Sequence, residues 1–461
     1  MPHKSVVSAR AASPQVQWQS HFQEKIPPEI ASYIFKLAVE SESECRADRS
    51  RLAVQLSSVC RSWRNVALMT PHIWTQIYIS AREEYSEEWL SILEEWIRRS
   101  KSLLIDVIFI PFSKEEEEAQ VQAGLSVDTT AEELKLVAAL TKSIGKWRSF
   151  VSCRNREPHD LFHTILVKTN GQKFLSLTEL EVRSMTPADC IDAIERSPLL
   201  RSFSAHEMMP VQVHKSKYQA VLHKSLKVLD LKSGWWGWLP VETVLSRFTF
   251  PKLHEAILDL ADKFTQEPVV DFFERHKPCP LTKLHLKFGE ERHTEAVFEK
   301  IAGFLPNVKE LTLDYQYPAE LNESELLYLW RSGSPEKNPS SEYVPPLPKL
   351  QSLEYYIGTR LPWRKTPFDL WPFILALFPI ALKGGDPPSL RPELKKFITN
   401  CAFSYKERLS ESIAALRDAG IVYEEVDLST ASDMASAEGD SESDGEGVEE
   451  TDSDSELDAD K

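Results

Sequence analysis

Residues 25–75 read KIPPEIASYIFKLAVESESECRADRSRLAVQLSSVCRSWRNVALMTPHIWT, and this stretch decides how the chain is organised. Pro27 and Pro28 stand where a helix begins, because the first helical turn tolerates proline's fixed φ and missing N–H. Apolar residues then recur at three- and four-residue steps on two successive segments, as the faces of helices do. They are Ile30, Ile34, Phe35 and Leu37, followed by Leu56, Val59, Cys60, Trp63 and Ala67 on a second helix. Two short helices cannot each bury such a face alone, so they must pack together or against a partner.

This pattern resembles an F-box, the module that docks a substrate receptor onto the Skp-type adaptor of SCF ubiquitin ligases. The resemblance is carried by IPPEI at 26–30, IF at 34–35, VCRSWR at 59–64 and PHIW at 71–74. The second half is similar to the F-box-like proteins abundant in basidiomycete fungi. The chain departs from the usual pattern at Ile26, where leucine is usual, and in the long charged insert 40–51. The alternative is an unrelated helical cap packed on the domain behind it.

The resemblance also implies which side chains meet the adaptor. These adaptor-binding candidates are Pro27, Glu29, Ile30, Ile34, Phe35, Leu37, Leu56, Val59, Cys60 and Trp63.

The chain has 461 residues, more than one hydrophobic core holds, so two or three structural units are expected. Its net charge of −16 is concentrated, because residues 424–461 hold 16 acidic residues and one lysine. Ser, Asp, Glu and Gly dominate 429–461, which predicts a disordered acidic tail. Ser441, Ser443, Thr451, Ser453 and Ser455 each have an acidic residue three positions on, the pattern of acidophilic kinase sites. The alternative is a passive solubilising tail.

The six cysteines are scattered without C-x-x-C spacing, which favours reduced thiols and no metal site. No run reaches 18 apolar residues and the first residues lack an apolar signal core, so neither a membrane span nor export is expected. The near-neutral charge of the rest of the chain gives no support to nucleic-acid binding. We therefore expect a cytoplasmic and/or nuclear protein without a cofactor.

A repeat of the form L-x-x-L-x-L runs through residues 146–360. Clear copies start at Leu226, Leu281 and Val308, and looser ones start at 177, 200, 253 and 350. The first six starts are 23 to 28 residues apart, and proline stands one or two residues before five of the seven. A strand followed by a helix every 20–29 residues is the signature of leucine-rich repeats, which stack into a curved parallel sheet backed by helices. The alternative is an ordinary doubly wound α/β domain, which shares the alternation.

Residues between the buried positions of each strand face the opposite side of the sheet. Their charges alternate between neighbouring strands: acidic at 255 and 259, basic at 283 and 287, acidic at 310 and 314. This face could hold a protein target, or could be an ordinary solvated surface. A tryptophan-rich loop beside it could bind too, or could fill a gap next to a divergent repeat. The target-binding candidates are Lys232, Trp235, Trp236, Trp238, Lys283, His285, Lys287, Glu310 and Asp314.

Residues 389–420 are expected to be helical, with Leu394, Phe397, Ile398 and Cys401 on one face, and 421–423 are expected to add a closing strand. The predicted α/β organisation is a flexible N-terminus at 1–20, an F-box-like domain at 21–80, linker helices and a first strand at 81–145, irregular leucine-rich repeats at 146–360, capping helices and a strand at 361–428, and a disordered acidic tail at 429–461.

The sequence holds no phosphate-binding G-x-x-x-x-G-K-[ST], no G-x-G-x-x-G, no H-E-x-x-H and no G-x-S-x-G, so an enzyme is not expected. We predict the substrate-recognition subunit of an SCF-type cullin–RING ubiquitin ligase. Its partners would be a Skp-type adaptor, a cullin through that adaptor, and an unknown target protein. The alternative function is a protein-interaction scaffold outside any ligase, with or without the adaptor.

Overall fold

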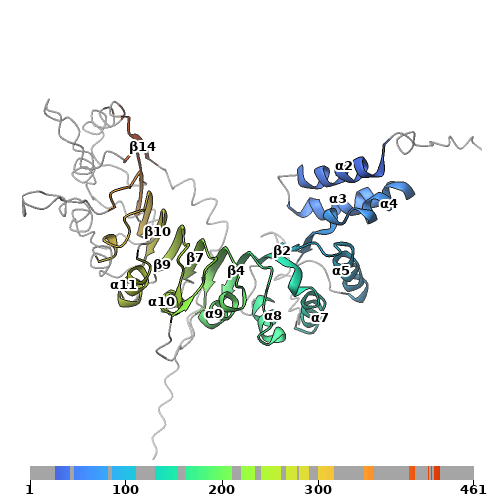
Figure 1. Cartoon of the computed structure of the whole chain (residues 1–461), viewed down its shortest axis with the longest axis horizontal. Helices are drawn as coiled ribbons and strands as arrows, with labels where there is room; N and C mark the ends of the chain where they lie inside the picture. The colour runs from blue at the N-terminus through green and yellow to red at the C-terminus, as the bar shows by residue number, and fades with distance from the viewer. Residues whose placement is uncertain are drawn as a thin grey trace, which may run out of the picture.

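The computed structural model describes residues 26–41, 46–80, 86–110, 130–152, 161–209, 220–233, 240–260, 266–277, 280–289, 300–315, 347–357, 394–399, 414, 417 and 420–425. In these parts of the chain, a group of helices at the N-terminal end is followed by a long parallel sheet (Figure 1). The sheet and its helices form an arc, with the helical group at one end and β14 at the other.

The N-terminal helical unit consists of four elements: α2 (Pro28–Ser41), α3 (Arg46–Ser58), α4 (Arg61–Met69) and the 3-10 helix η1 (Pro71–Trp74). It has a small apolar core of its own, made of Phe35, Val39, Ala53, Leu56, Ala67, Ile73 and Trp74. The predicted start of the first helix at the proline pair is confirmed. The prediction of one second helix is wrong, because two helices are present there. α3 ends at Ser58, and Cys60, whose backbone is extended (φ −158°), is the N-cap of α4.

Twelve described strands form one sheet in which sheet order follows chain order and every pairing is parallel. They are β1 (Gln76–Ser80), β2 (Ile105–Ile110), β3 (Trp147–Ser152), β4 (Glu179–Met185), β5 (Ser202–Met208), β7 (Val228–Ser233), β9 (Glu255–Leu260), β10 (Lys283–Phe288), β11 (Glu310–Tyr315), β12 (Ser352–Ile357), β13 (Lys396–Thr399) and β14 (Val422–Glu425). The short strands β6 (Val221–Leu222) and β8 (Phe248–Thr249) pair separately.

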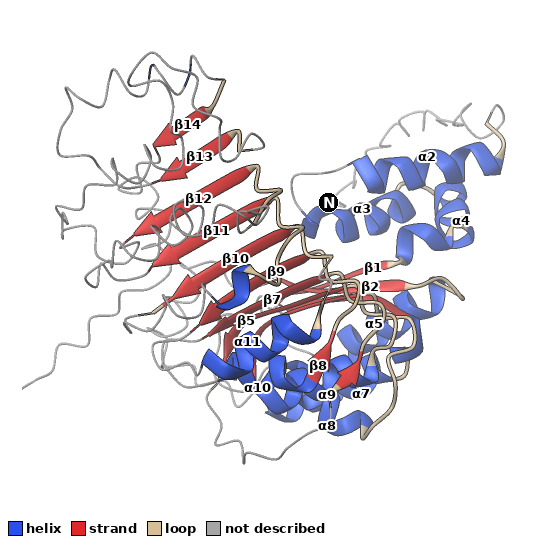
Figure 2. Ribbon diagram, turned by 60° about the vertical axis from the view of Figure 1, so that its left-hand side comes forward, coloured by secondary structure: helices blue, strands red, loops and turns tan. Residues whose placement is uncertain are grey.

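Helices connect successive strands and lie along the outer side of the arc (Figures 1 and 2). They are α5 (Glu87–Arg99), α7 (Thr130–Thr141), the 3-10 helix η2 (Ile144–Lys146), α8 (Leu161–Thr169), α9 (Pro187–Arg196), α10 (Pro240–Arg247) and α11 (Gln266–Arg275). A doubly wound domain reverses its strand order part-way and has helices on both faces. The described part of this chain shows neither feature, and its α/β architecture is consistent with a repeat solenoid.

The predicted repeat register is confirmed in the strands. Leu226, Leu229 and Leu231 are fully buried, and the equivalent residues of β10 and β11 are at most 2% exposed. The residues between them lie on the inner face, opposite one another in the sheet, such as Lys283 beside Glu310. Each strand therefore contributes buried residues to a core shared with its two neighbours, as stacked repeats must do.

The structure differs from the sequence prediction at both ends of the sheet. The sheet begins at β1, within the range predicted as the F-box-like domain, whereas the linker helices and first strand predicted at 81–145 correspond to α5, β2 and α7. Lys396–Thr399 is strand β13 instead of part of a helix, because it pairs with both β12 and β14. The predicted closing strand at 421–423 is confirmed as β14. The predicted acidic tail and its phosphorylation candidates, Ser441, Ser443, Thr451, Ser453 and Ser455, lie outside the described residues. None of the described helices has the length and apolar content needed to cross a membrane.

Candidate functional site

Helix α2 carries two apolar stripes that face in different directions. Ala31, Phe35 and Val39 form the inner stripe and are buried against α3 and α4. The outer stripe is 41–58% exposed and consists of Ile30, Tyr33, Ile34 and Leu37. At 3.6 residues per turn the two stripes lie roughly 150° apart, so one face of α2 builds the core and the other is left in solvent.

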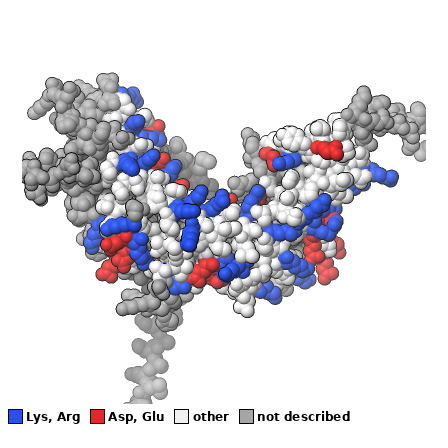
Figure 3. Space-filling model, in the orientation of Figure 1, with Lys and Arg blue, Asp and Glu red and all other residues white. Residues whose placement is uncertain are grey.

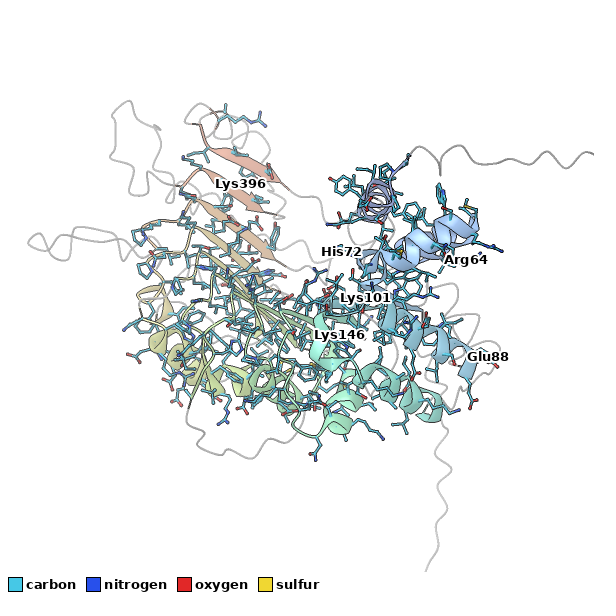
Figure 4. All side chains as sticks on the ribbon, turned by 45° about the vertical axis from the view of Figure 1, so that its right-hand side comes forward. Arg64, His72, Glu88, Lys101, Lys146 and Lys396 are labelled. Atoms are coloured by element: carbon cyan, nitrogen blue, oxygen red, sulfur yellow. The ribbon has the colours of Figure 1, made fainter. Side chains whose placement is uncertain are left out.

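The rest of the helical unit adds further exposed apolar side chains, namely Val54 on α3, Val59 before α4 and Met69 at the end of α4. Figure 3 shows the unit as a largely uncharged surface, in contrast to the basic and acidic side chains over the sheet and its helices. Figure 4 views α2 nearly end-on, with side chains extending both toward its neighbours and away from them. Exposed apolar surface of this extent is typical of a protein-binding site.

The structure separates the predicted adaptor-binding residues into two groups. Pro27, Glu29, Ile30, Ile34, Leu37 and Val59 lie at the surface. Phe35 and Leu56 are buried in the core of the unit and support that surface from beneath. Trp63 is half-buried, with its ring 5.1 Å from that of Phe35, and Cys60 accepts a hydrogen bond from the Trp63 backbone N–H.

Sequence reasoning missed Tyr33, Val54 and Met69. Tyr33 is 58% exposed and lies three residues after Ile30, so the helical periodicity itself carried the signal.

A tryptophan pair joins the helical unit to the sheet domain. Trp74 is fully buried and donates its indole N–H to the carbonyl of Ala67, at 2.8 Å. Its ring meets Trp96 of α5 edge-on, with centroids 4.8 Å apart, and the Arg99 guanidinium lies 4.5 Å from its centroid. Each such contact contributes about 0.5–2 kcal/mol beyond area burial, so the junction holds the exposed stripe in a fixed relation to the first strands.

The helical unit thus contains three α-helices, of which α2 has one buried and one exposed apolar face, and its last helical element, η1, has the sequence Pro-x-x-Trp. The F-box-like family model matches residues 23–80. The match includes α2, α3, α4 and η1 and ends with the last residue of β1. No curated protein matches the chain.

F-box domains typically bind Skp-type adaptors. In the F-box-like unit of this chain, the outer stripe of α2 is an exposed apolar surface among the described residues.

The predicted target-binding residues lie on the inner face of the sheet. Lys283 Nζ is 2.8 Å from Glu310 Oε2, and Lys287 Nζ is 3.3 Å from Asp259 Oδ2, so the alternating charges pair across strands as predicted. Asp314 is half-buried on β11. The candidates Trp235, Trp236 and Trp238 lie outside the described residues.

His285 lies on β10 within this face and is half-buried. Its Nε2 atom has no hydrogen-bond partner among the described residues. Burial, reinforced by the charge of Lys287, lowers the pKa of His285 to about 4, so the ring is neutral at pH 7. A neutral imidazole between charged neighbours makes the middle of the face less polar than its surroundings.

A polar network that the sequence did not predict crosses β4, β5 and β7, and β9 lies between this network and His285 on β10. Glu181 on β4 contacts His206 Nε2 at 3.1 Å, and Lys232 Nζ lies 3.1 Å from His206 Nδ1. Lys232 also pairs with Asp230, which accepts a hydrogen bond from Ser204 at 3.0 Å. These residues are neighbours only because the parallel register brings equivalent positions of successive repeats together.

Proposed function

We propose that this chain is the substrate-recognition subunit of an SCF-type cullin–RING ubiquitin ligase. The observation that carries the proposal is the F-box-like unit whose α2 buries one apolar stripe and exposes another. The exposed stripe would bind the Skp-type adaptor, and a cullin would be reached through that adaptor. We also propose that the sheet is an irregular leucine-rich-repeat domain of the kind that follows an F-box in basidiomycete proteins.

Exposed and buried apolar residues of the F-box-like unit would have different roles. Ile30, Ile34 and Leu37 would be covered by the adaptor, which removes half-exposed apolar surface from water. Phe35 and Leu56 would keep the helices packed so that the stripe stays in place. Their contribution to binding would be indirect, through the stability of the unit.

The sheet domain would hold the target protein. Its inner face offers paired charges at Lys283, Lys287 and Glu310 and a neutral centre at His285. Because Trp74 and Trp96 fix the F-box-like unit to the first helix of the sheet domain, a bound target would be held at a set distance from the adaptor. Ubiquitin transfer on other subunits would then be an effectively intramolecular encounter, and the chain itself would catalyse no reaction.

Co-purification of the tagged full-length chain from its own cells tests this function. Recovery of a Skp-type adaptor together with a cullin is the expected result. Recovery of the adaptor without a cullin would favour a role outside the ligase. Recovery of neither would favour a scaffold whose helical unit binds no adaptor.

A further inference from the structure

From β3 to β13, the residues at one equivalent backbone position, at or just before the start of each strand, form a continuous row of hydrogen bonds along the edge of the sheet. Each N–H in the row donates to the carbonyl of the equivalent residue in the preceding strand, at 2.7–2.9 Å. The row runs from Arg148 through Thr178, Arg201, Lys227, His254, Thr282, Lys309 and Gln351 to Lys395. Thr178 and Thr282 reinforce it with side-chain hydrogen bonds to the same carbonyls. The fold therefore lines up five lysines and arginines and His254, one strand or two apart, that are far apart in the sequence.

Among the described residues, the turns that lead into β2 to β13 contain no acidic residue. They are 100–104, 143–148, 170–178, 197–201, 223–227, 250–254, 280–282, 305–309, 347–351 and 394–395. Together they hold 11 lysines and arginines and not one aspartate or glutamate. Figure 3 shows lysine and arginine side chains gathered across the middle of the visible face, and Figure 4 labels Lys101 and Lys146 at this edge. We call these 11 residues the basic edge.

Most of the basic edge has no counter-charge. In the part of the chain that the structure describes, Arg148 pairs with Asp106, but no ion pair reaches Arg201, Lys227, Lys309 or Lys395. All four of these side chains are exposed. The helix carboxyl ends nearby carry only partial negative charge, and those of α8 and α10 already accept hydrogen bonds from Arg196 and Arg275 of the helices that follow them. An unpaired line of cations on adjacent strands is an electrostatic site for an extended anion.

We propose that the basic edge binds the chain's own acidic segment, residues 426–461. This segment follows β14 in the sequence and holds 14 acidic residues and one lysine, a net charge of −13. The basic edge contributes 11 positive charges, so the two are nearly complementary. The proposal concerns a contact within the chain and does not depend on adaptor or target binding.

The geometry allows the contact. Arg201 on β5 and Lys395 beside β13 are six strand spacings apart, about 29 Å at ~4.8 Å per spacing. The 36 residues of the acidic segment can extend to about 120 Å at ~3.3 Å per residue. A tethered anion is present at an effective concentration of about 1 mM or more, higher than a free competitor usually reaches.

The same row of cations would also attract nucleic acid, but two observations favour the acidic segment. The acidic segment belongs to the same chain as the cations, and the described sheet edge has no exposed Phe, Tyr or Trp side chain among them for stacking bases. Occupation by the acidic segment would screen the edge from other polyanions. Phosphorylation of Ser441, Ser443, Thr451, Ser453 or Ser455 would tighten the contact by adding charge.

Zero-length carbodiimide cross-linking of the full-length chain, read by mass spectrometry, tests the proposal. Amide links from carboxylates of 427–460 should form at Lys227, Lys309 and Lys395, and should be rare at Lys168, an exposed lysine on α8 that serves as the matched control. Raising the salt from 0.1 to 1 M shortens the Debye length from about 10 to about 3 Å and should remove most of these links. Substituting all three row lysines by glutamine should make cleavage of the segment by a Glu-specific protease roughly fivefold faster or more, whereas Lys168→Gln should not change it.

Links to Lys168 as frequent as links to the row, or no links to the row at all, would overturn the proposal. A labelled 20-residue single-stranded DNA provides the remaining comparison. Row-dependent binding of that DNA to a chain that shows no segment links would assign the basic edge to nucleic acid instead.

Discussion

Truncating the outer stripe of α2 should abolish adaptor binding without unfolding the chain. The variant is Ile30→Ala, Ile34→Ala and Leu37→Ala together. These side chains are 50%, 41% and 44% exposed, so roughly half of each remains to be buried by a partner. Full burial of such a side chain contributes about 1.5–3 kcal/mol, so the three half-burials add about 2–4 kcal/mol to binding. The Kd for a Skp-type adaptor should rise roughly 30- to 700-fold.

The assay is calorimetric titration of the purified full-length chain with a Skp-type adaptor, accompanied by thermal denaturation. The matched control truncates three exposed apolar residues on the helices of the sheet domain: Ile92→Ala, Leu134→Ala and Val167→Ala, which are 60%, 46% and 65% exposed. Exposed substitutions change stability by only about 0.5 kcal/mol, so both triple variants should melt like the parent. A Kd that is unchanged in the α2 variant, or raised equally in the control, would refute the assignment of the surface.

Three further perturbations have defined outcomes. Phe35→Ala removes a fully buried ring and should destabilise the F-box-like unit by about 3–5 kcal/mol, so hydrogen exchange of α2–α4 amides should speed up along with the loss of adaptor binding. The pKa of His285 is about 4 in the folded chain against ~6.5 unfolded, so the unfolded chain binds the extra proton and stability falls as pH drops through this window. The free energy of unfolding, measured by urea titration, should fall between pH 7 and pH 5, and this fall should be about 2 kcal/mol smaller in His285→Gln than in the parent chain. Gly420 has φ +75°, a conformation that costs alanine energy although a Cβ added there would meet no described atom within 4 Å. Gly420→Ala should therefore destabilise the β13–β14 end of the sheet by about 1 kcal/mol, which faster amide exchange there would measure.

The repeat pattern predicted the sheet well where leucines recur at regular steps. β4 to β12 follow it because each L-x-x-L-x-L places three side chains in the shared core. β1 was not predicted as a sheet member because its sequence, QIYIS, lacks that pattern. β2 (IDVIFI) lacks it too, and its place was predicted only as a first strand somewhere in 81–145. β13 was mistaken for a helix because Leu394, Phe397 and Ile398 also fit helical spacing, and a short buried parallel strand cannot be told from a helix by periodicity alone.

The sequence predicted the F-box-like unit but not the direction of each side chain. Periodicity groups residues on a face, yet it does not say which face the chain itself covers, so Phe35 and Leu56 were placed on the binding surface and Tyr33 was overlooked. The basic edge could not be predicted from the sequence for a different reason. The positions of the hydrogen-bonded row along this edge lie 23 to 44 residues apart in sequence and become neighbours only when parallel strands stack in register.

Side-chain footprinting of the full-length chain with and without a purified Skp-type adaptor tests the central claim most directly. We predict that oxidation of Ile30, Tyr33, Ile34 and Leu37 drops several-fold in the complex, while Ile92 and Val167 react as before. An adaptor that leaves the α2 stripe fully reactive, or that forms no complex with the chain, would contradict it.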